Sequence, residues 1–227
     1  VMRYLEYQVL SSSNYSIAAC HLEETPLRSV LGLVSYQLGK NLTRKDLVER
    51  AGMENDVYKA MEDLTKGERY YYFNMATHEG PDDLIDKIRF LVTAMGVDYV
   101  FFEPVQDVVT GNVSDKESIL SDLSNKLKRL APELNVGIIV VAHANDEGDT
   151  KYCKTIAQSA SFEIRLERDM NAETELERNR TYVSVGRKNR VGGGSGPAGT
   201  LLFDKETYML TPEVSFKDMS NETDVGF

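Results

Sequence analysis

The sequence predicts an α/β fold with a mostly parallel central sheet, flanking helices, and antiparallel strands at the C-terminal edge. Apolar runs of strand length alternate with amphipathic stretches through the first half, and the end of the chain is rich in β-type segments. Two of the runs, VDYVFFE at 97–103 and GIIVVAH at 137–143, end in a polar residue. Parallel sheets present functional groups in this way, at the edge where ligands bind.

Helical spacing, turn residues and apolar runs define the elements of the first half. Pro26 suits the first turn of a helix, Asp56 suits a helix cap, and Gly96 suits a helix end. In order, we expect a helix at 1–10, a strand at 16–21, a helix from 26, a helix at 57–64, a strand at 70–75 and a helix at 80–94.

The second half begins with the strand at 97–102 and ends in a β-rich region. Leucines and an isoleucine at helical spacing predict an amphipathic helix at 113–130. Strands are expected at 136–141, 162–166 and 182–185, a turn at 192–197, and a hairpin pairing 201–203 with 208–210.

Length and composition favour one globular domain. We expect this domain to span residues 1–213, followed by a polar tail at 214–227. The formal charge of −10 argues against broad coating of nucleic acid, although a local basic patch stays compatible with DNA binding. Two cysteines make no disulfide framework, and the three histidines lack metal-ligand spacing. With no secretory leader and no membrane-length apolar run, we expect a cytoplasmic protein.

Two acids follow buried strands and are candidate catalytic groups. Glu103 ends the run VDYVFFE, where a carboxylate holds a water on Mg²⁺ in P-loop ATPases; the alternative is a carboxylate that caps the next segment. Glu23 follows the strand at 16–21 and is suited to activate the attacking water, unless it only complements the start of the next helix. Glu24 is an adjacent alternative.

His143 ends the third apolar strand. A neutral imidazole there can report a γ-phosphate to the loop that follows, or it can be an ordinary histidine at the sheet edge. Two polar loops at the same edge, 110–115 and 144–155, carry Asn112, Lys151 and Lys154 as candidate DNA contacts. Both loops are equally compatible with plain solvated segments.

A basic cluster of Arg187, Lys188 and Arg190 precedes a glycine-rich turn. An arginine that reaches a neighbouring subunit's nucleotide is worth roughly 10³–10⁵ in rate, whereas a basic strand end on the surface is the commoner case. The glycines at 192–196 are not a phosphate loop, because no Lys-Ser or Lys-Thr follows them.

Together, the order of these motifs resembles the RecA-like helicase domain of ring-shaped replicative DNA helicases, and most of all that of bacteriophage primase–helicases. The likeness runs from residue 1 to about 213. HLEE at 21–24 resembles the segment with the catalytic glutamate, which falls on Glu23, and VDYVFFE resembles the Walker B strand. GIIVVAH resembles the strand that ends in the phosphate sensor, here His143. KNRVGGGSGPAGTLLFDKET resembles the final segment, whose Lys-x-Arg pair falls on Lys188 and Arg190.

The resemblance implies ATP (or another NTP) and Mg²⁺ as cofactors and single-stranded DNA in the pore of a homo-oligomeric ring, a hexamer. It implies that Glu103 orders the metal and that Lys188 and Arg190 act on the neighbour's nucleotide. One departure is Glu103 itself, because the family usually has Asp there; the longer side chain still reaches a metal-bound water.

A second departure is that no G-x-x-x-x-G-K-[ST] occurs, so the first strand and the P-loop of the core are missing from the sequence. Truncation, a split gene or an intervening element would each explain this, and we favour a split gene with a separate P-loop fragment. We expect the chain alone to be inactive in ATP hydrolysis and prone to self-association. The alternatives to a helicase are a RecA-like recombinase or regulatory ATPase, and a non-catalytic subunit that pairs with a P-loop-bearing partner.

Overall fold

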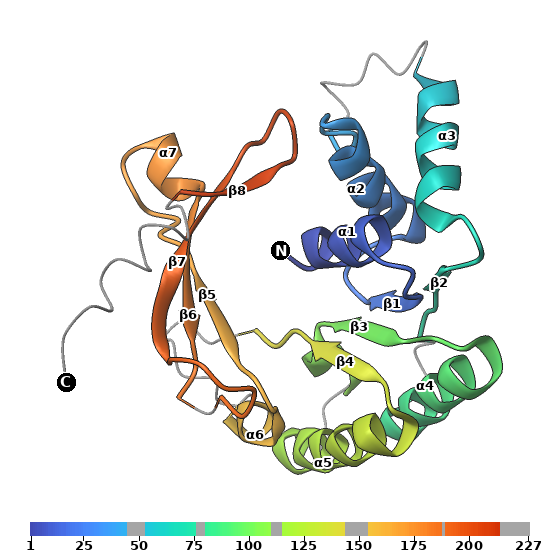
Figure 1. The fold of residues 1–227 in the computed structure, drawn as a ribbon. Helices are drawn as coiled ribbons and strands as arrows, with labels where there is room; N and C mark the ends of the chain where they lie inside the picture. The colour runs from blue at the N-terminus through green and yellow to red at the C-terminus, as the bar shows by residue number, and fades with distance from the viewer. Residues whose placement is uncertain (45–52, 76–79, 110–114, 144–153, 188, 214–227) are drawn as a thin grey trace. The chain divides into compact units, whose positions relative to one another are not determined.

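The computed structural model describes residues 1–44, 53–75, 80–109, 115–143, 154–187 and 189–213 (Figure 1). These residues form two compact units, Val1–Ala160 and Ser161–Phe227. Each unit contains its own sheet. The predicted polar tail at 214–227 lies outside the described residues.

The first unit is built on a four-stranded sheet in which all described pairings are parallel. Its strand order is β2-β1-β3-β4, so β1 and β3 are central and β4 is an edge strand of the described sheet. The bounds are β1 (Ile17–His21), β2 (Tyr70–Tyr72), β3 (Tyr99–Glu103) and β4 (Gly137–Val140). The four strands expected in the first part of the chain are confirmed, although β2 is shorter than the aromatic run that predicts it.

Helices cover both faces of this sheet, which explains why its strands are apolar throughout (Figure 1). Ile17, Ala19 and Phe101 face one side, and alternate residues such as Cys20 and Phe102 face the other. The first face packs against α1 (Met2–Ser12), α2 (Pro26–Leu38) and α3 (Glu54–Thr65), and the second against α4 (Pro81–Met95) and α5 (Lys116–Leu134).

The helix boundaries follow local capping chemistry. Thr25 accepts a hydrogen bond from the Arg28 backbone N–H at 3.3 Å, and Pro26 occupies the first turn of α2. Gly96 ends α4 in a left-handed conformation, with φ of 69°. The prediction that Asp56 caps a helix is wrong, because α3 begins at Glu54 and Asp56 lies inside its first turn. An acid there favours the helix through the helix dipole.

Between these elements, the 3₁₀ helix η1 (Val105–Val108) follows β3 directly, and the short helix α6 (Lys154–Ser159) follows the segment after β4. Neither was predicted. None of the helices in the described ranges is both long and apolar enough to cross a membrane.

The second unit is an antiparallel sheet of order β5-β6-β7-β8. The strands expected near the end of the chain therefore hydrogen-bond among themselves within the described residues. The predicted hairpin is confirmed by the pairing of Phe203 with Leu210 across a turn in which Asp204 accepts a backbone hydrogen bond from Glu206 at 2.8 Å. The bounds are β5 (Ile164–Glu167), α7 (Glu175–Arg178), β6 (Arg180–Val185), β7 (Gly196–Phe203) and β8 (Leu210–Pro212).

Candidate functional site

The site lies at the carboxyl ends of the central strands of the first unit. β1 and β3 end together, because His21 and Glu103 are register partners. Beyond β1, the Leu22 backbone N–H donates to the Glu103 carbonyl oxygen at 2.8 Å, which keeps the chain against the end of β3. Alongside, the Val105 N–H donates to the carbonyl oxygen of Val141 at 3.0 Å, which joins the end of β3 to the chain after β4.

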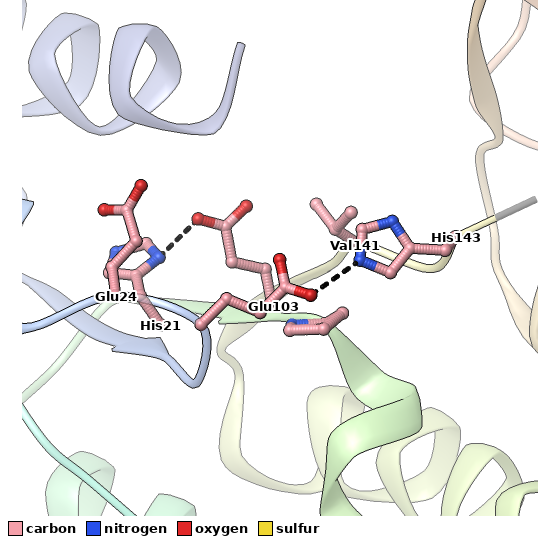
Figure 2. Close-up of a pocket in the computed structure, with 7 residues that line it drawn as sticks. His21, Glu24, Glu103, Val141 and His143 are labelled. Atoms are coloured by element: carbon pink, nitrogen blue, oxygen red, sulfur yellow. Dashed lines mark hydrogen bonds and ion pairs between the residues drawn. The ribbon is translucent and has the colours of Figure 1, made fainter.

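These strand ends surround a cavity of about 160 Å³ (Figure 2). Ligand pockets for whole small molecules are typically ~300–1,000 Å³, so this cavity is smaller than a pocket that encloses a whole small molecule. It is lined by His21, Glu23, Glu24, Glu103, Pro104, Val141 and His143. The sequence-predicted residues Glu23, Glu103 and His143 are thus brought to one place by three separate strands.

Glu23 and His143 form the exposed side of the site. The two side chains approach each other, with His143 Nε2 3.4 Å from Glu23 Oε1, and both are more than half exposed, at 57% for His143 and 60% for Glu23. The backbone carbonyl of His143 accepts a hydrogen bond from Gln106 Nε2 at 3.0 Å. The contact between the Glu23 and His143 side chains leaves the Glu23 carboxylate accessible to solvent and to a ligand.

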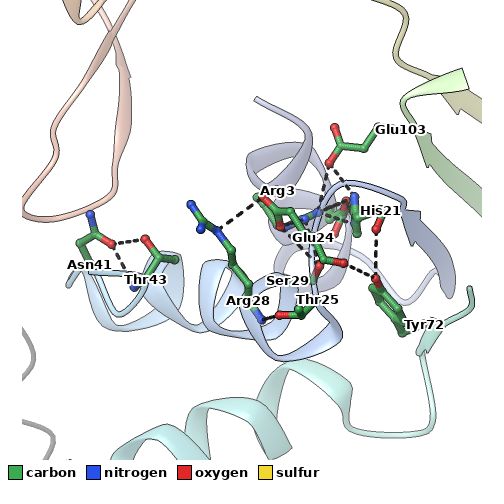
Figure 3. Close-up of polar contacts among 11 residues, drawn as sticks. Arg3, His21, Glu24, Thr25, Arg28, Ser29, Asn41, Thr43, Tyr72 and Glu103 are labelled. Carbon is green, nitrogen blue, oxygen red and sulfur yellow. Dashed lines mark hydrogen bonds and ion pairs between the residues drawn. The ribbon is translucent and has the colours of Figure 1, made fainter. Parts of the chain in front are cut away.

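Glu24 is held differently from its neighbour. Its carboxylate is paired with the Arg3 guanidinium and lies 3.5 Å from the hydroxyl of Ser29 (Figure 3). Tyr72 donates its hydroxyl to the backbone carbonyl of Glu24 at 3.3 Å and to that of His21 at 3.2 Å. Within the described residues, Glu23 is therefore the one of the two adjacent acids without a buried cation on its carboxylate.

Glu103 sits in a buried network of charged groups. Its Oε1 lies 2.6 Å from His21 Nδ1, and Glu6 Oε1 lies 3.0 Å from His21 Nε2. An ionised carboxylate only accepts hydrogen bonds, so a His21 ring nitrogen that carries a proton can donate to Glu103 or to Glu6. Arg3 lies against the same ring, and its guanidinium is paired with the carboxylates of Glu6, Glu24 and Glu103.

The pKa values of the network follow from these contacts. Burial by itself lowers the pKa of His21, but its hydrogen bonds to Glu103 and Glu6 prevail and raise the pKa above the usual value. Burial opposes the charged form of Glu103, yet the hydrogen bond and charge of His21, together with Arg3, hold the pKa of Glu103 below its usual value. Glu103 is therefore an anion across the physiological range.

The remaining predicted residues lie elsewhere or outside the described residues. Arg190 belongs to the second unit, where its backbone N–H donates to the Ser161 carbonyl at 2.9 Å, and its side chain is exposed. Arg187 is exposed as well. Asn112, Lys151 and Lys188 lie outside the described residues, and Lys154 is described only as the first residue of α6.

Sequence reasoning missed Arg3, Glu6 and the partnership of His21. Arg3 and Glu6 lie on the same buried face of α1 as Leu10, at helical spacing, with Glu6 fully buried. Charged residues placed at core positions of an amphipathic helix were the available signal, because such residues are almost never buried without a partner.

Comparisons with known proteins agree with this fold. A solved ATPase domain matches with a TM-score of 0.73 at 19% identity, covering 92% of this chain and 79% of that one. A DnaB-like replicative helicase, solved in a study of its interactions with primase, matches with a TM-score of 0.71 at 18% identity, covering 92% of this chain and 55% of that one. No protein-family model matches the chain.

The parallel sheet of the first unit and the antiparallel sheet of the second thus have the fold of the RecA-like ATPase domains of DnaB-like helicases. In sequence, the chain is homologous to the DNA helicase/primase of Enterobacteria phage T3, with 24% identity over 91% of this chain. The chain spans 38% of that relative's length.

Proposed function

We propose that this chain is the C-terminal part of the motor domain of an ATP-dependent replicative DNA helicase of phage type. The observation that carries the proposal is the meeting of Glu23, Glu103 and His143 at the carboxyl ends of adjacent parallel strands, in one cavity. The homology to a phage DNA helicase/primase supports the same reaction class.

Glu23 is proposed as the general base. Its carboxylate is exposed, lines the cavity and has no buried cation beside it within the described residues, which supports a role in orienting the attacking water and accepting its proton. A positioned general base contributes roughly 10²–10⁴-fold to the rate.

Glu103 is proposed to hold the magnesium end of the site. Mg²⁺ is usually held by one or two carboxylates together with waters and substrate phosphates, and the anionic Glu103 beside Glu23 fits that donor set. No group of three metal-ligating side chains occurs among the described residues. Phosphates and waters would supply the other ligands, as they usually do for Mg²⁺. When bound, Mg²⁺ would neutralise charge that develops on the phosphates.

His143 is proposed to connect the nucleotide to the DNA. Its ring contacts the base Glu23 and its backbone is tied to η1 through Gln106, while the chain leads on to the predicted DNA loop at 144–155. A γ-phosphate that competes with Glu23 for the imidazole would change the position of that loop.

Other contacts would come from outside this site. Arg190 and Lys188 are proposed to act on the nucleotide of a neighbouring subunit in a hexameric ring, and Asn112, Lys151 and Lys154 to contact single-stranded DNA in its pore. The P-loop would come from a separate fragment. An apolar edge strand such as β4 is suited to receive a further strand. We place the assembly in the cytoplasm of the infected cell.

The test is ATP hydrolysis with and without single-stranded DNA, for the chain alone and after mixing with a fragment that carries a P-loop. We expect turnover only in the mixture, stimulated by DNA and abolished by Arg190→Ala. A matched variant is Arg187→Ala, which removes a neighbouring exposed arginine and should retain turnover.

Other outcomes decide against this function. Turnover and DNA binding without strand separation would favour a RecA-like recombinase or regulatory ATPase. Tight association with the fragment but no turnover would favour a non-catalytic subunit. Robust turnover by the chain alone would contradict our expectation that the phosphate-binding backbone amides are needed.

A further inference from the structure

Arg3 is the most unusual residue of the first unit. It lies in the first turn of α1 and is only 6% exposed, although arginine is rarely buried. Its guanidinium contacts carboxylates from three different segments: Glu6 of α1 at 3.1 Å, Glu24 after β1, and Glu103 at the end of β3 at 3.6 Å. Figure 3 shows Arg3 between Glu24 and Glu103. It also donates to the Ser29 hydroxyl at 3.1 Å.

The fold makes room for this side chain. Gly32 lies inside α2, where glycine costs about 0.5–1 kcal/mol relative to alanine. A methyl group at that position would lie 3.2 Å from Cδ of Arg3 and 3.4 Å from its Cγ. The aliphatic part of the Arg3 side chain thus packs closely against the backbone of α2. Glycine, which disfavours helices, occupies the position of that contact.

Stability alone is a weak explanation for this arrangement. Well-packed apolar residues of similar volume often stabilise a protein as well as a buried ion cluster does, because the charges must be taken out of water. Nε of Arg3 and Oε2 of Glu6 even lack hydrogen-bond partners within the described residues. What an apolar replacement cannot do is fix two separate carboxylates at the edge of the cavity. The planar guanidinium fork suits that task.

We propose that Arg3 is a positioning residue of the nucleotide site, which holds the carboxylates of Glu24 and Glu103 in place and leaves Glu23 free to meet the substrate. The proposal rests on the proposed function for its catalytic meaning. Its structural part, that Arg3 restrains two of the three carboxylates and not the third, can be measured without nucleotide.

The experiment is carboxylate labelling of the 227-residue chain with a water-soluble carbodiimide and an amine, read residue by residue by mass spectrometry. In the parent chain, Glu23 should label faster than Glu24 and Glu103, since its side chain is 60% exposed against 31% and 24%. In Arg3→Met, labelling of Glu24 should rise about tenfold, the scale of a lost charge-assisted hydrogen bond, while Glu23 stays unchanged. Labelling of Glu103 should rise less, because Glu103 keeps its contact with His21 at 2.6 Å.

A second variant and a control keep the result interpretable. Arg3→Lys retains the charge, so it should fold even where Arg3→Met does not, but a point charge reaches fewer carboxylates; labelling of Glu24, Glu103 or both should still rise. The control is Arg180→Met, which removes an arginine that also bridges two carboxylates, Glu177 and Glu213, but in the second unit. It should leave Glu24 and Glu103 labelling as in the parent.

The proposal is overturned if Glu24 and Glu103 keep their slow labelling in a folded Arg3→Lys chain, or if all three acids label alike in the parent. In the ATP hydrolysis assay with the P-loop fragment, Arg3→Lys should lower kcat about tenfold with KM unchanged. Labelling as expected without any turnover would contradict the proposed function alone. Turnover that depends on Glu23, with labelling insensitive to Arg3, would contradict the positioning role alone.

Discussion

Glu23 and Glu24 are adjacent in sequence and line the same cavity, yet they belong to different regions of the site. Glu23 faces solvent beside His143, whereas Glu24 faces a buried arginine and Ser29. One region contains exposed groups with few constraints, and the other contains charged groups fixed by several partners each. The comparison shows that the surroundings of a carboxylate, more than its position in a motif, decide whether it is available for proton transfer.

The buried region should dominate stability. Arg3→Met leaves Glu6 buried and without its cation, and breaking a buried pair from one side typically costs about 3–5 kcal/mol. We expect the free energy of unfolding, measured by urea denaturation, to fall on that scale. Arg180→Met removes ion pairs whose carboxylates, Glu177 and Glu213, are 41% and 33% exposed, and it should lower the free energy of unfolding much less than Arg3→Met does. Equal losses of unfolding free energy in Arg3→Met and Arg180→Met would contradict the special contribution of the buried region to stability.

The variants Glu24→Gln and Glu23→Gln compare the two regions of the site at adjacent residues. Glu24→Gln removes the charge from a partly buried pair and should cost about 1–3 kcal/mol of unfolding free energy. Glu23→Gln should stay within about 0.5 kcal/mol of the parent, as surface substitutions usually do. Both values come from the same denaturation experiment, and a reversed order would contradict the structure.

The smallest effect is expected at Tyr70, whose hydroxyl is buried next to the charged network with no hydrogen-bond partner in the described part of the chain. Burial, and then the charge of Glu6, raise the pKa of Tyr70 well above its usual value. Because the folded chain disfavours the ionised form of Tyr70, the hydroxyl does not reduce the free energy of unfolding below the unfolded-state pKa, near 10. Above that pH the tyrosine ionises more readily in the unfolded chain, so stability is lost as the pH rises.

Tyr70→Phe should therefore be nearly neutral at pH 8 and should move alkaline unfolding to higher pH. Thermal unfolding between pH 8 and 11 measures this. The matched control is Tyr58→Phe, because Tyr58 is 72% exposed and should show no such change. An alkaline transition that is the same in the parent and in Tyr70→Phe would show that the Tyr70 hydroxyl ionises freely in the folded chain.

Much of the site followed from the sequence, because parallel strands end at a common edge. The strands ending near His21 and at Glu103 were predicted from apolar runs alone, and so was the acid after each. The proximity of Glu23 and His143 follows from the same topology, although the distance between their side chains could not be predicted from the sequence.

The buried network could not be predicted in the same way. Arg3 and Glu6 occupy core-facing positions of α1, but their partners His21 and Glu103 are far along the chain, and only the tertiary fold brings them together. The local pattern of α1 indicates that Arg3 and Glu6 are buried, but it does not identify their partners. The short helix α7 was missed for a related reason, since four residues give too little periodicity to detect.

The most direct test of the account is the ATP hydrolysis rate of Glu23→Gln and Glu24→Gln, each combined with a P-loop fragment and single-stranded DNA. We predict that Glu23→Gln lowers kcat by roughly 10²–10⁴-fold, the loss of a general base, while Glu24→Gln stays within about tenfold of the parent. A larger loss for Glu24→Gln than for Glu23→Gln, with both chains folded, would contradict the assignment of the catalytic base and of the two regions of the site.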